Sequence, residues 1–118
     1  MNTIITLPSK IKWEDYEKEL DKVKNFEENM FFKVPTKPKQ LNIGDKCYLV
    51  HQGFVKGWMQ VMGIWKIEFD CTTTGKKWPA GIYIARSGPF HELKTPIPMK
   101  GFQGYRYAPI EWDDLEIK

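Results

Sequence analysis

Two segments rich in β-branched and aromatic residues, 46–51 and 54–69, are separated only by Gln52 and Gly53. A two-residue connection that contains glycine is typical of a tight β-hairpin, because glycine adopts the backbone angles that such a turn requires. This hairpin constrains the fold more than any other part of the sequence. It predicts an antiparallel sheet at the centre of the protein.

Alternating polar and apolar side chains within 54–69 predict a strand with one buried and one solvated face. Lys56 and Lys66 have the parity of the solvated face. The residues of the other parity, which we expect to be buried, are Val55, Met59, Val61, Trp65, Ile67 and Phe69. Gly57 and Gly63 share this apolar parity, and we expect them to mark bends or a close approach of another backbone.

Apolar residues spaced by three and four predict an amphipathic helix that begins near Trp13, with Ser9 available as its N-terminal cap. The apolar stripe consists of Trp13, Tyr16, Leu20 and Val23. Glu and Lys alternate on the opposite face, which we expect to be solvated and to contain pairs of opposite charge one turn apart.

Shorter β-rich segments predict further strands, and segments rich in Pro, Gly or polar residues predict the loops between them. The predicted strands are 3–7, 30–34, 81–86 and 105–107. We expect 72–79 to be a polar loop around Gly75 and 87–104 to be largely loop. The acidic end, 111–118, is expected to be either a helical turn or frayed. One helix and about six strands predict a small α+β domain around a partly closed barrel.

Chain length and composition indicate one folded domain. With 118 residues, of which 42% are hydrophobic and 28% charged, residues 1–118 can bury one core without disulfides, and a disordered chain is excluded. No apolar run reaches the ~20 residues that a membrane span requires. Residues 1–12 lack the basic start and long apolar stretch of a signal peptide. We therefore expect a cytoplasmic protein with reduced thiols and no membrane contact.

The charge of the chain is unevenly distributed. The formal net charge is +3, but residues 34–110 contain 11 Lys or Arg and 4 acidic residues, a net charge of +7. Residues 1–33 have a net charge of −1, and 111–118 of −3. A positively charged body attracts polyanions, so nucleic acid is the first partner to consider. The alternative is a Lys-rich surface that only keeps a small protein soluble.

The order strand, amphipathic helix, strand is followed by Gly44 and Asp45, the segment KCYLV and the hairpin sequence GFVKGWMQVMGI. This arrangement resembles the PUA-like superfamily over residues 3–86, and its ASCH and EVE branches are the most similar. In these families a strand of the form V-x-G-x-x-x-V-x-G-I returns from the Gly-Asp turn, and its counterparts here are Val55, Gly57, Val61, Gly63 and Ile64. The resemblance implies a PUA-like pseudobarrel of about six mostly antiparallel strands with one N-terminal amphipathic helix. It also implies binding of RNA or a modified base in a cleft.

Basic residues interleaved with aromatic residues in the second half of the chain predict a nucleic-acid site. Cations neutralise phosphates, and flat rings stack on unpaired bases. We expect the site to be formed by Lys76, Lys77, Trp78, Arg86, Lys100, Phe102, Tyr105 and Arg106. Gly101 and Gly104 would allow a backbone to come close to phosphate oxygens. The alternative is that the rings close the open end of the barrel while the cations face water.

Trp58 has the parity of the polar side chains around it. Either it is a platform for a base, or the N-terminal helix covers that face and Trp58 packs against the helix. An exposed Trp58 together with the acidic end, 111–118, would instead suit a protein partner.

An enzyme is the second interpretation, because some members of the similar families cleave RNA or hydrolyse modified nucleosides. Lys76, Lys77 or His91 would then act as a general acid or base or stabilise charge. The G-x-K-x-x-E-x-R motif common in ASCH domains does not occur in residues 25–35, so a binding module is favoured. The Cys and His residues lack the spacing of a zinc site, and there is no phosphate-binding loop or dinucleotide fingerprint. We therefore expect no metal and no cofactor.

Overall fold

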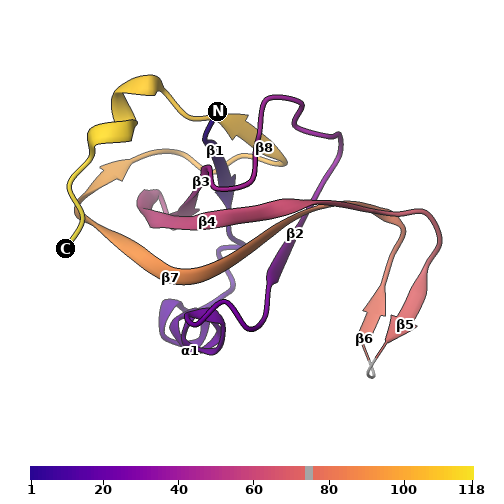
Figure 1. The fold of residues 1–118 in the computed structure, drawn as a ribbon. Helices are drawn as coiled ribbons and strands as arrows, with labels where there is room; N and C mark the ends of the chain where they lie inside the picture. The colour runs from indigo at the N-terminus through magenta and orange to yellow at the C-terminus, as the bar shows by residue number, and fades with distance from the viewer. Residues whose placement is uncertain (74–75) are drawn as a thin grey trace.

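Six strands form one curled, mixed sheet, a half-barrel, and the helix α1 packs against one of its faces (Figure 1). This computed structural model describes residues 1–73 and 76–118. The strand order across the sheet is β2-β7-β4-β3-β1-β8. The strands are β1 (Thr3–Thr6), β2 (Met30–Val34), β3 (Lys46–His51), β4 (Phe54–Ile67), β7 (Gly81–Pro98) and β8 (Tyr105–Tyr107). The prediction of a small α+β protein with about six strands in its sheet is confirmed.

The predicted hairpin joins β3 to β4. Gln52 (φ 49°) and Gly53 (φ 84°) both have positive φ, as the central residues of a type I′ turn must. β1 pairs in parallel with β3, with Thr3 opposite Cys47, whereas the other strand pairs of this sheet are antiparallel. The sheet is therefore mostly antiparallel, as predicted.

An extra residue in β4 divides its apolar side chains between two cores. The register with β3 shifts between Val55 and Gly57, so Lys56 has no opposite residue and forms a β-bulge. A shift of one residue moves every following side chain to the other face. Val55 consequently packs in one core and Met59 in the other. The expectation that these two residues share one face is wrong.

The last of three register shifts between β4 and β7, at Val61 and Gly63, changes the orientation of the outer half of β4. Beyond this shift Ile64 packs against the core beneath the helix, while Trp65 is 47% exposed. Phe69, just after the strand, is 80% exposed. The expectation that Trp65 and Phe69 are buried is wrong, because simple parity assumes an uninterrupted strand.

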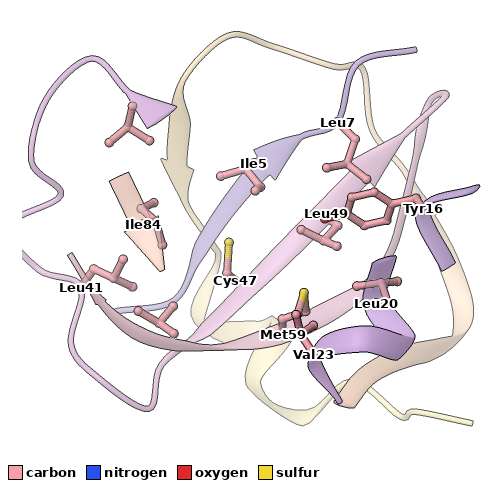
Figure 2. Packing of buried hydrophobic residues seen from close by; sticks show 12 residues of the cluster. Ile5, Leu7, Tyr16, Leu20, Val23, Leu41, Cys47, Leu49, Met59 and Ile84 are labelled. Atoms are coloured by element: carbon pink, nitrogen blue, oxygen red, sulfur yellow. The ribbon is translucent and has the colours of Figure 1, made fainter. Parts of the chain in front are cut away.

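The first core lies between α1 (Trp13–Val23) and one face of the sheet. Tyr16, Leu20 and Val23 of the apolar stripe are buried there, as predicted, beside Leu49 and Met59 (Figure 2). Trp13, the first residue of the stripe, is partly buried and packs against this core. Lys12 occupies the N-cap position without a side-chain hydrogen bond, so the prediction that Ser9 caps the helix is wrong. In the described part of the chain, no helix is long and apolar enough to cross a membrane.

The second core lies on the opposite face of the sheet, and the C-terminal segment covers it. Tyr48 and Leu93 are buried in this core, and Trp112 packs against it. Trp112 belongs to the 3-10 helix η1 (Ile110–Asp114). The hydroxyl of Tyr48 donates a hydrogen bond to the carbonyl oxygen of Trp112 at 2.8 Å. Of the two expectations for the acidic end, the helical turn is therefore confirmed.

β7 extends to Pro98, far beyond the predicted strand 81–86, although it contains three prolines. β2 pairs with β7 as far as Arg86, and beyond it the C-terminal residues 116–118 pair with β7 around Leu93. The three prolines lie outside both of these pairings, so their missing N–H costs no ladder hydrogen bond on that side. Pro89 and Pro96 also fall in gaps of the pairing with β4. The prediction of a loop directly after residue 86 is wrong, since the chain leaves the sheet only after Pro98.

β5 (Cys71–Thr73) and β6 (Lys76–Trp78) pair as a separate two-stranded sheet. Figure 1 shows this short hairpin extending from the outer ends of β4 and β7. It replaces most of the predicted polar loop, whose central Gly75 lies outside the described residues.

Candidate nucleic-acid interface

The eight residues predicted to bind nucleic acid lie in three separate parts of the structure. They are Lys76, Lys77 and Trp78 in β6, Arg86 in β7, and Lys100, Phe102, Tyr105 and Arg106 before and within β8. The side chain of Lys76 lies outside the described part of the structure. Each of the three groups has a different environment.

Arg86 is buried in the protein interior, with 2% of its surface exposed. Its Nη1 donates a hydrogen bond to the hydroxyl of Tyr16 at 3.2 Å and lies 3.9 Å from the sulfur of Met59. Its Nε is buried without a hydrogen-bond partner among the described residues. A buried cation of this kind is costly and cannot reach a phosphate on the surface without a large rearrangement. We therefore place Arg86 in the core and outside the interface.

Trp78 is half-buried and supports other aromatic rings, while the neighbouring Lys77 is exposed. The ring of Trp78 meets Phe31 edge-on at 5.2 Å and Tyr83 at 6.0 Å between centroids. Phe31 in turn packs against Trp65 at 4.7 Å. The most exposed ring of this cluster is thus Trp65, which parity reasoning had assigned to the core. The sequence signal for the exposure of Trp65 is Gly63, because glycine within a strand often marks a bulge and a bulge reverses the parity of the residues after it.

The segment that follows β7 passes over the end of β1 and forms one wall of a cleft of about 610 Å³. The backbone N–H of Phe102 donates a hydrogen bond to Oγ1 of Thr6 at 3.1 Å. A Cβ at Gly101 would lie 2.9 Å from Cγ2 of Thr6, so only glycine allows this close approach. The segment 99–104, predicted as loop, therefore has a fixed position against β1.

The lining of this cleft, which we call the Phe102 cleft, suits a flat ligand with polar edges. Every lining residue that the structure describes is uncharged. The lining includes two phenyl rings and several side chains that form hydrogen bonds, namely Phe32, Phe102, Gln52, Gln103, Ser9 and Thr6. Rings stack on an unpaired base, and amides and hydroxyls bind its edges. The volume is in the range of small-ligand sites.

Arg106 lies over the ring of Phe102, with its Cζ 4.2 Å from the ring centroid. Arg106 is exposed, whereas Phe102 is half-buried and also packs against the second core. The cation–π contact holds the guanidinium plane in a defined position. Such a plane can stack on a base or donate hydrogen bonds to a phosphate. Lys100, also exposed, adds a second cation next to Gly101 in the chain.

Tyr105 and its neighbour Tyr107 attach β8 to the connection between β2 and β3. The hydroxyl of Tyr105 lies 3.3 Å from Oγ1 of Thr36. The hydroxyl of Tyr107 accepts a hydrogen bond from the backbone N–H of Gln40 at 3.0 Å. Tyr105 is thus placed between the cleft and the Lys-rich turn that follows β2.

The ring of Trp58 is covered by other side chains and not by the helix α1. The ring of His91 stacks on it at 4.0 Å with an interplanar angle of 24°, and Nζ of Lys46 lies 4.8 Å from its centroid. Lys46 also donates a hydrogen bond to the carbonyl oxygen of Asp113 at 3.0 Å, which connects this group to the C-terminal segment. Of the two interpretations, the one in which Trp58 packs beneath α1 is wrong, since it packs against the second core.

Of the residues named for acid-base chemistry, His91 lies in β7 of the main sheet and Lys77 in the separate β5-β6 hairpin. His91 stacks on Trp58, and burial together with the charge of Lys46 lowers its pKa. Glu92, the next residue, accepts a hydrogen bond from Nζ of Lys118 at 3.0 Å. Burial raises the pKa of the Cys47 thiol, which keeps it protonated and unreactive. Among the side chains of residues 1–70 and 77–118, no three from His, Cys, Asp or Glu are grouped to hold a metal ion.

Comparisons with known proteins returned no match: no family model, no curated protein and no solved structure is significantly similar to this chain. The function of the cleft therefore has to follow from its own contacts and charges.

Proposed function

We propose that the protein binds single-stranded nucleic acid, in the first place RNA or a modified base within it, through the Phe102 cleft. The observation that carries this proposal is the guanidinium of Arg106, 4.2 Å above the ring of Phe102, beside an uncharged cleft of about 610 Å³. Rings and amides in the cleft suit an unpaired base, and the cations beside it suit the phosphates. A base within a duplex is stacked and paired, so it cannot enter without being flipped out.

A PUA-like fold and a cytoplasmic location are part of the same proposal. The order β1, α1, β2 and the Gly44–Asp45 turn before β3 support the first. The backbone N–H of Gly44 donates a hydrogen bond to the carbonyl oxygen of Val61, and the N–H of Val61 donates one to that of Asp45, each at 2.8 Å. The two motifs that carry the resemblance are therefore bonded to each other.

Fluorescence anisotropy of a labelled single-stranded RNA tests the proposal. A strand of about 12 nucleotides covers the site sizes common for such modules, and single-stranded DNA and duplex DNA are measured beside it. We expect the single strands to bind more tightly than the duplex. We also expect the log of the affinity to fall with the log of the salt concentration by about 0.7 per phosphate contacted.

Two matched variants locate the binding. Arg106→Ala should weaken binding about ten-fold, since loss of one stacking partner has this order of effect. Lys18→Ala removes the same charge from the exposed face of α1 and should leave binding nearly unchanged. Arg86 is not a suitable test residue, because its loss would disturb the core. Equal affinities of the two variants, or binding that ignores salt, would exclude the cleft as the site.

A further inference from the structure

A second groove, which we call the Trp65 groove, lies at the outer half of β4 and has a volume of about 480 Å³. Its lining includes Lys37, Asn42, Ile43, Gly63 and Trp65. Lys37 is the one charged residue among the described residues of this lining. An aromatic wall, an amide and a cation match the chemistry of a nucleotide. The carboxylate of Asp45 lies beside this lining, where it accepts a hydrogen bond from the backbone N–H of Asn42 at 2.8 Å.

The ring of Trp65 is supported from behind and open in front. It packs against Phe31 at 4.7 Å with an interplanar angle of 50°, yet 47% of its surface is exposed. Phe31 is itself held by Trp78 and Tyr83, which meet it nearly perpendicularly at 5.2 and 6.4 Å. A ring fixed in this way loses little conformational entropy when a base stacks on it.

The Trp65 groove and the Phe102 cleft are joined by three consecutive residues. A Cβ at Gly104, which lines the cleft, would lie 3.3 Å from Cδ of Pro35. The hydroxyls of Thr36 and Tyr105 are 3.3 Å apart, and Lys37 lines the groove. The Cα atoms of residues 35 and 37 are at most about 7 Å apart, given the reach of an extended chain. A strand of a few nucleotides therefore spans both sites.

The charge along this connection favours a polyanion. Residues 35–40 contain Lys37 and Lys39 and no acidic residue, and both lysines are exposed. Tyr107 binds the backbone of Gln40, so the connection is attached to the sheet close to both lysines. Phosphates that pass from one site to the other would meet cations at fixed places.

We propose that a single strand bound at the Phe102 cleft continues along residues 35–37 and stacks a further base on Trp65. This inference rests on the proposed function and extends it, because it assigns the protein a ligand of several consecutive nucleotides instead of one base. Trp65 and Lys37 then become binding residues.

The test compares uridine 5′-monophosphate, which can occupy only one site, with an oligouridylate of about 12 nucleotides, a length that covers typical single-strand sites. Trp65→Ala should weaken binding of the long strand about ten-fold, as expected for one lost stacking contact, and leave binding of the mononucleotide in the cleft unaffected. Trp65→Phe should keep most of the affinity. Phe26→Ala is the matched control, because Phe26 is 48% exposed and Trp65 47%. Arg106→Ala should weaken both ligands. Thermal unfolding of each variant shows that it is folded.

The outcomes separate this inference from the proposed function. If Arg106→Ala weakens the long strand while Trp65→Ala behaves like Phe26→Ala, the path to Trp65 is overturned and the cleft stands. If Trp65→Ala weakens the long strand but Arg106→Ala does not, the cleft is wrong and so is the continuous path. If wild-type protein binds neither ligand, both proposals fall.

Discussion

The two tryptophans of β4, Trp58 and Trp65, have the same side chain and opposite environments. Trp58 carries His91 on its ring at 4.0 Å and packs against the second core. Trp65 has Phe31 behind it and is 47% exposed. Simple alternation along the strand predicts the reverse, with Trp58 on the wet face and Trp65 in the core. The exposure of a strand residue thus depends on bulges and on what covers the sheet, as much as on parity.

The different environments of Trp58 and Trp65 suit different roles, one in stability and the other in binding. A ring that is stacked, covered and joined to a core contributes mainly to the free energy of unfolding. A ring that is supported on one side and open on the other contributes little to stability and is available to a ligand. Substitutions in and around these two residues should therefore have effects of different kinds.

Removal of residues 111–118 should have the largest effect on stability, because this segment covers the core to which Trp58 belongs. The truncation removes Trp112 and Leu115, which pack against this core. It should lower the free energy of unfolding by about 3 kcal/mol, the order expected when the burial of two large apolar side chains is lost. Urea unfolding followed by fluorescence measures it. The charge variants Glu111→Gln and Asp114→Asn keep the cover and should unfold like the wild type. Unchanged stability of the truncated chain would show that the segment is not part of the core.

Trp58→Ala should come next, with a loss of about 2 kcal/mol, below the range for a fully buried tryptophan because the residue is half-buried. Trp58→Phe keeps a ring against His91 and should lose clearly less. Both variants should bind RNA as the wild type does, when measured at a temperature where they are folded. A stable Trp58→Ala with weakened RNA binding would mean that Trp58 is the platform after all.

Trp65→Ala should lower the free energy of unfolding by less than about 1 kcal/mol, as is usual for exposed positions. The same urea titration, run beside Trp58→Ala, gives the ratio of the two effects. A loss equal to that of Trp58→Ala would show that Trp65 is a core residue and would remove the contrast between them.

The pH dependence of stability through His91 should be the smallest effect. Burial and the charge of Lys46 lower the pKa of His91 in the folded protein, so below about pH 6.5 the unfolded chain binds more protons at this residue than the folded one does. This residue therefore lowers the free energy of unfolding as the pH falls below about 6.5, and has no such effect above it. His91→Gln should show a flatter profile in urea unfolding across this range. Parallel profiles of variant and wild type would contradict the assignment.

Local elements of the fold could be predicted from the sequence with good accuracy. The segments 30–34, 46–51 and 105–107 are strands in the structure with the predicted bounds. Their limits depend on neighbouring residues, namely β-branched runs, prolines and a two-residue turn, and such signals act over a few positions. The long extension of β7 could not be predicted, because its prolines are tolerated only where they fall outside the pairings with β2 and the C-terminal residues or in gaps of the pairing with β4.

The candidate site was predictable only in part. Phe102 and Arg106 are four residues apart and do form a contact. Arg86 also has aromatic neighbours in the sequence, Tyr83 and Phe90, but it is buried beside Tyr16. Composition cannot distinguish the two arginines, because burial depends on which distant segment, here α1, lies over the strand.

The sequence alone therefore determined the amphipathic helix, the strands 30–34, 46–51 and 105–107, where the central hairpin turns, and that the body of the chain is basic. Only the tertiary structure decided that the sheet has a core on each face, that the C-terminal segment covers one of them, and that Trp65 rather than Trp58 is open to solvent. The physical reason is the distance along the chain over which each property acts. Propensity and alternation are properties of neighbouring residues, whereas bulges, burial and the meeting of the 35–37 connection with the Phe102 cleft depend on segments distant in the chain.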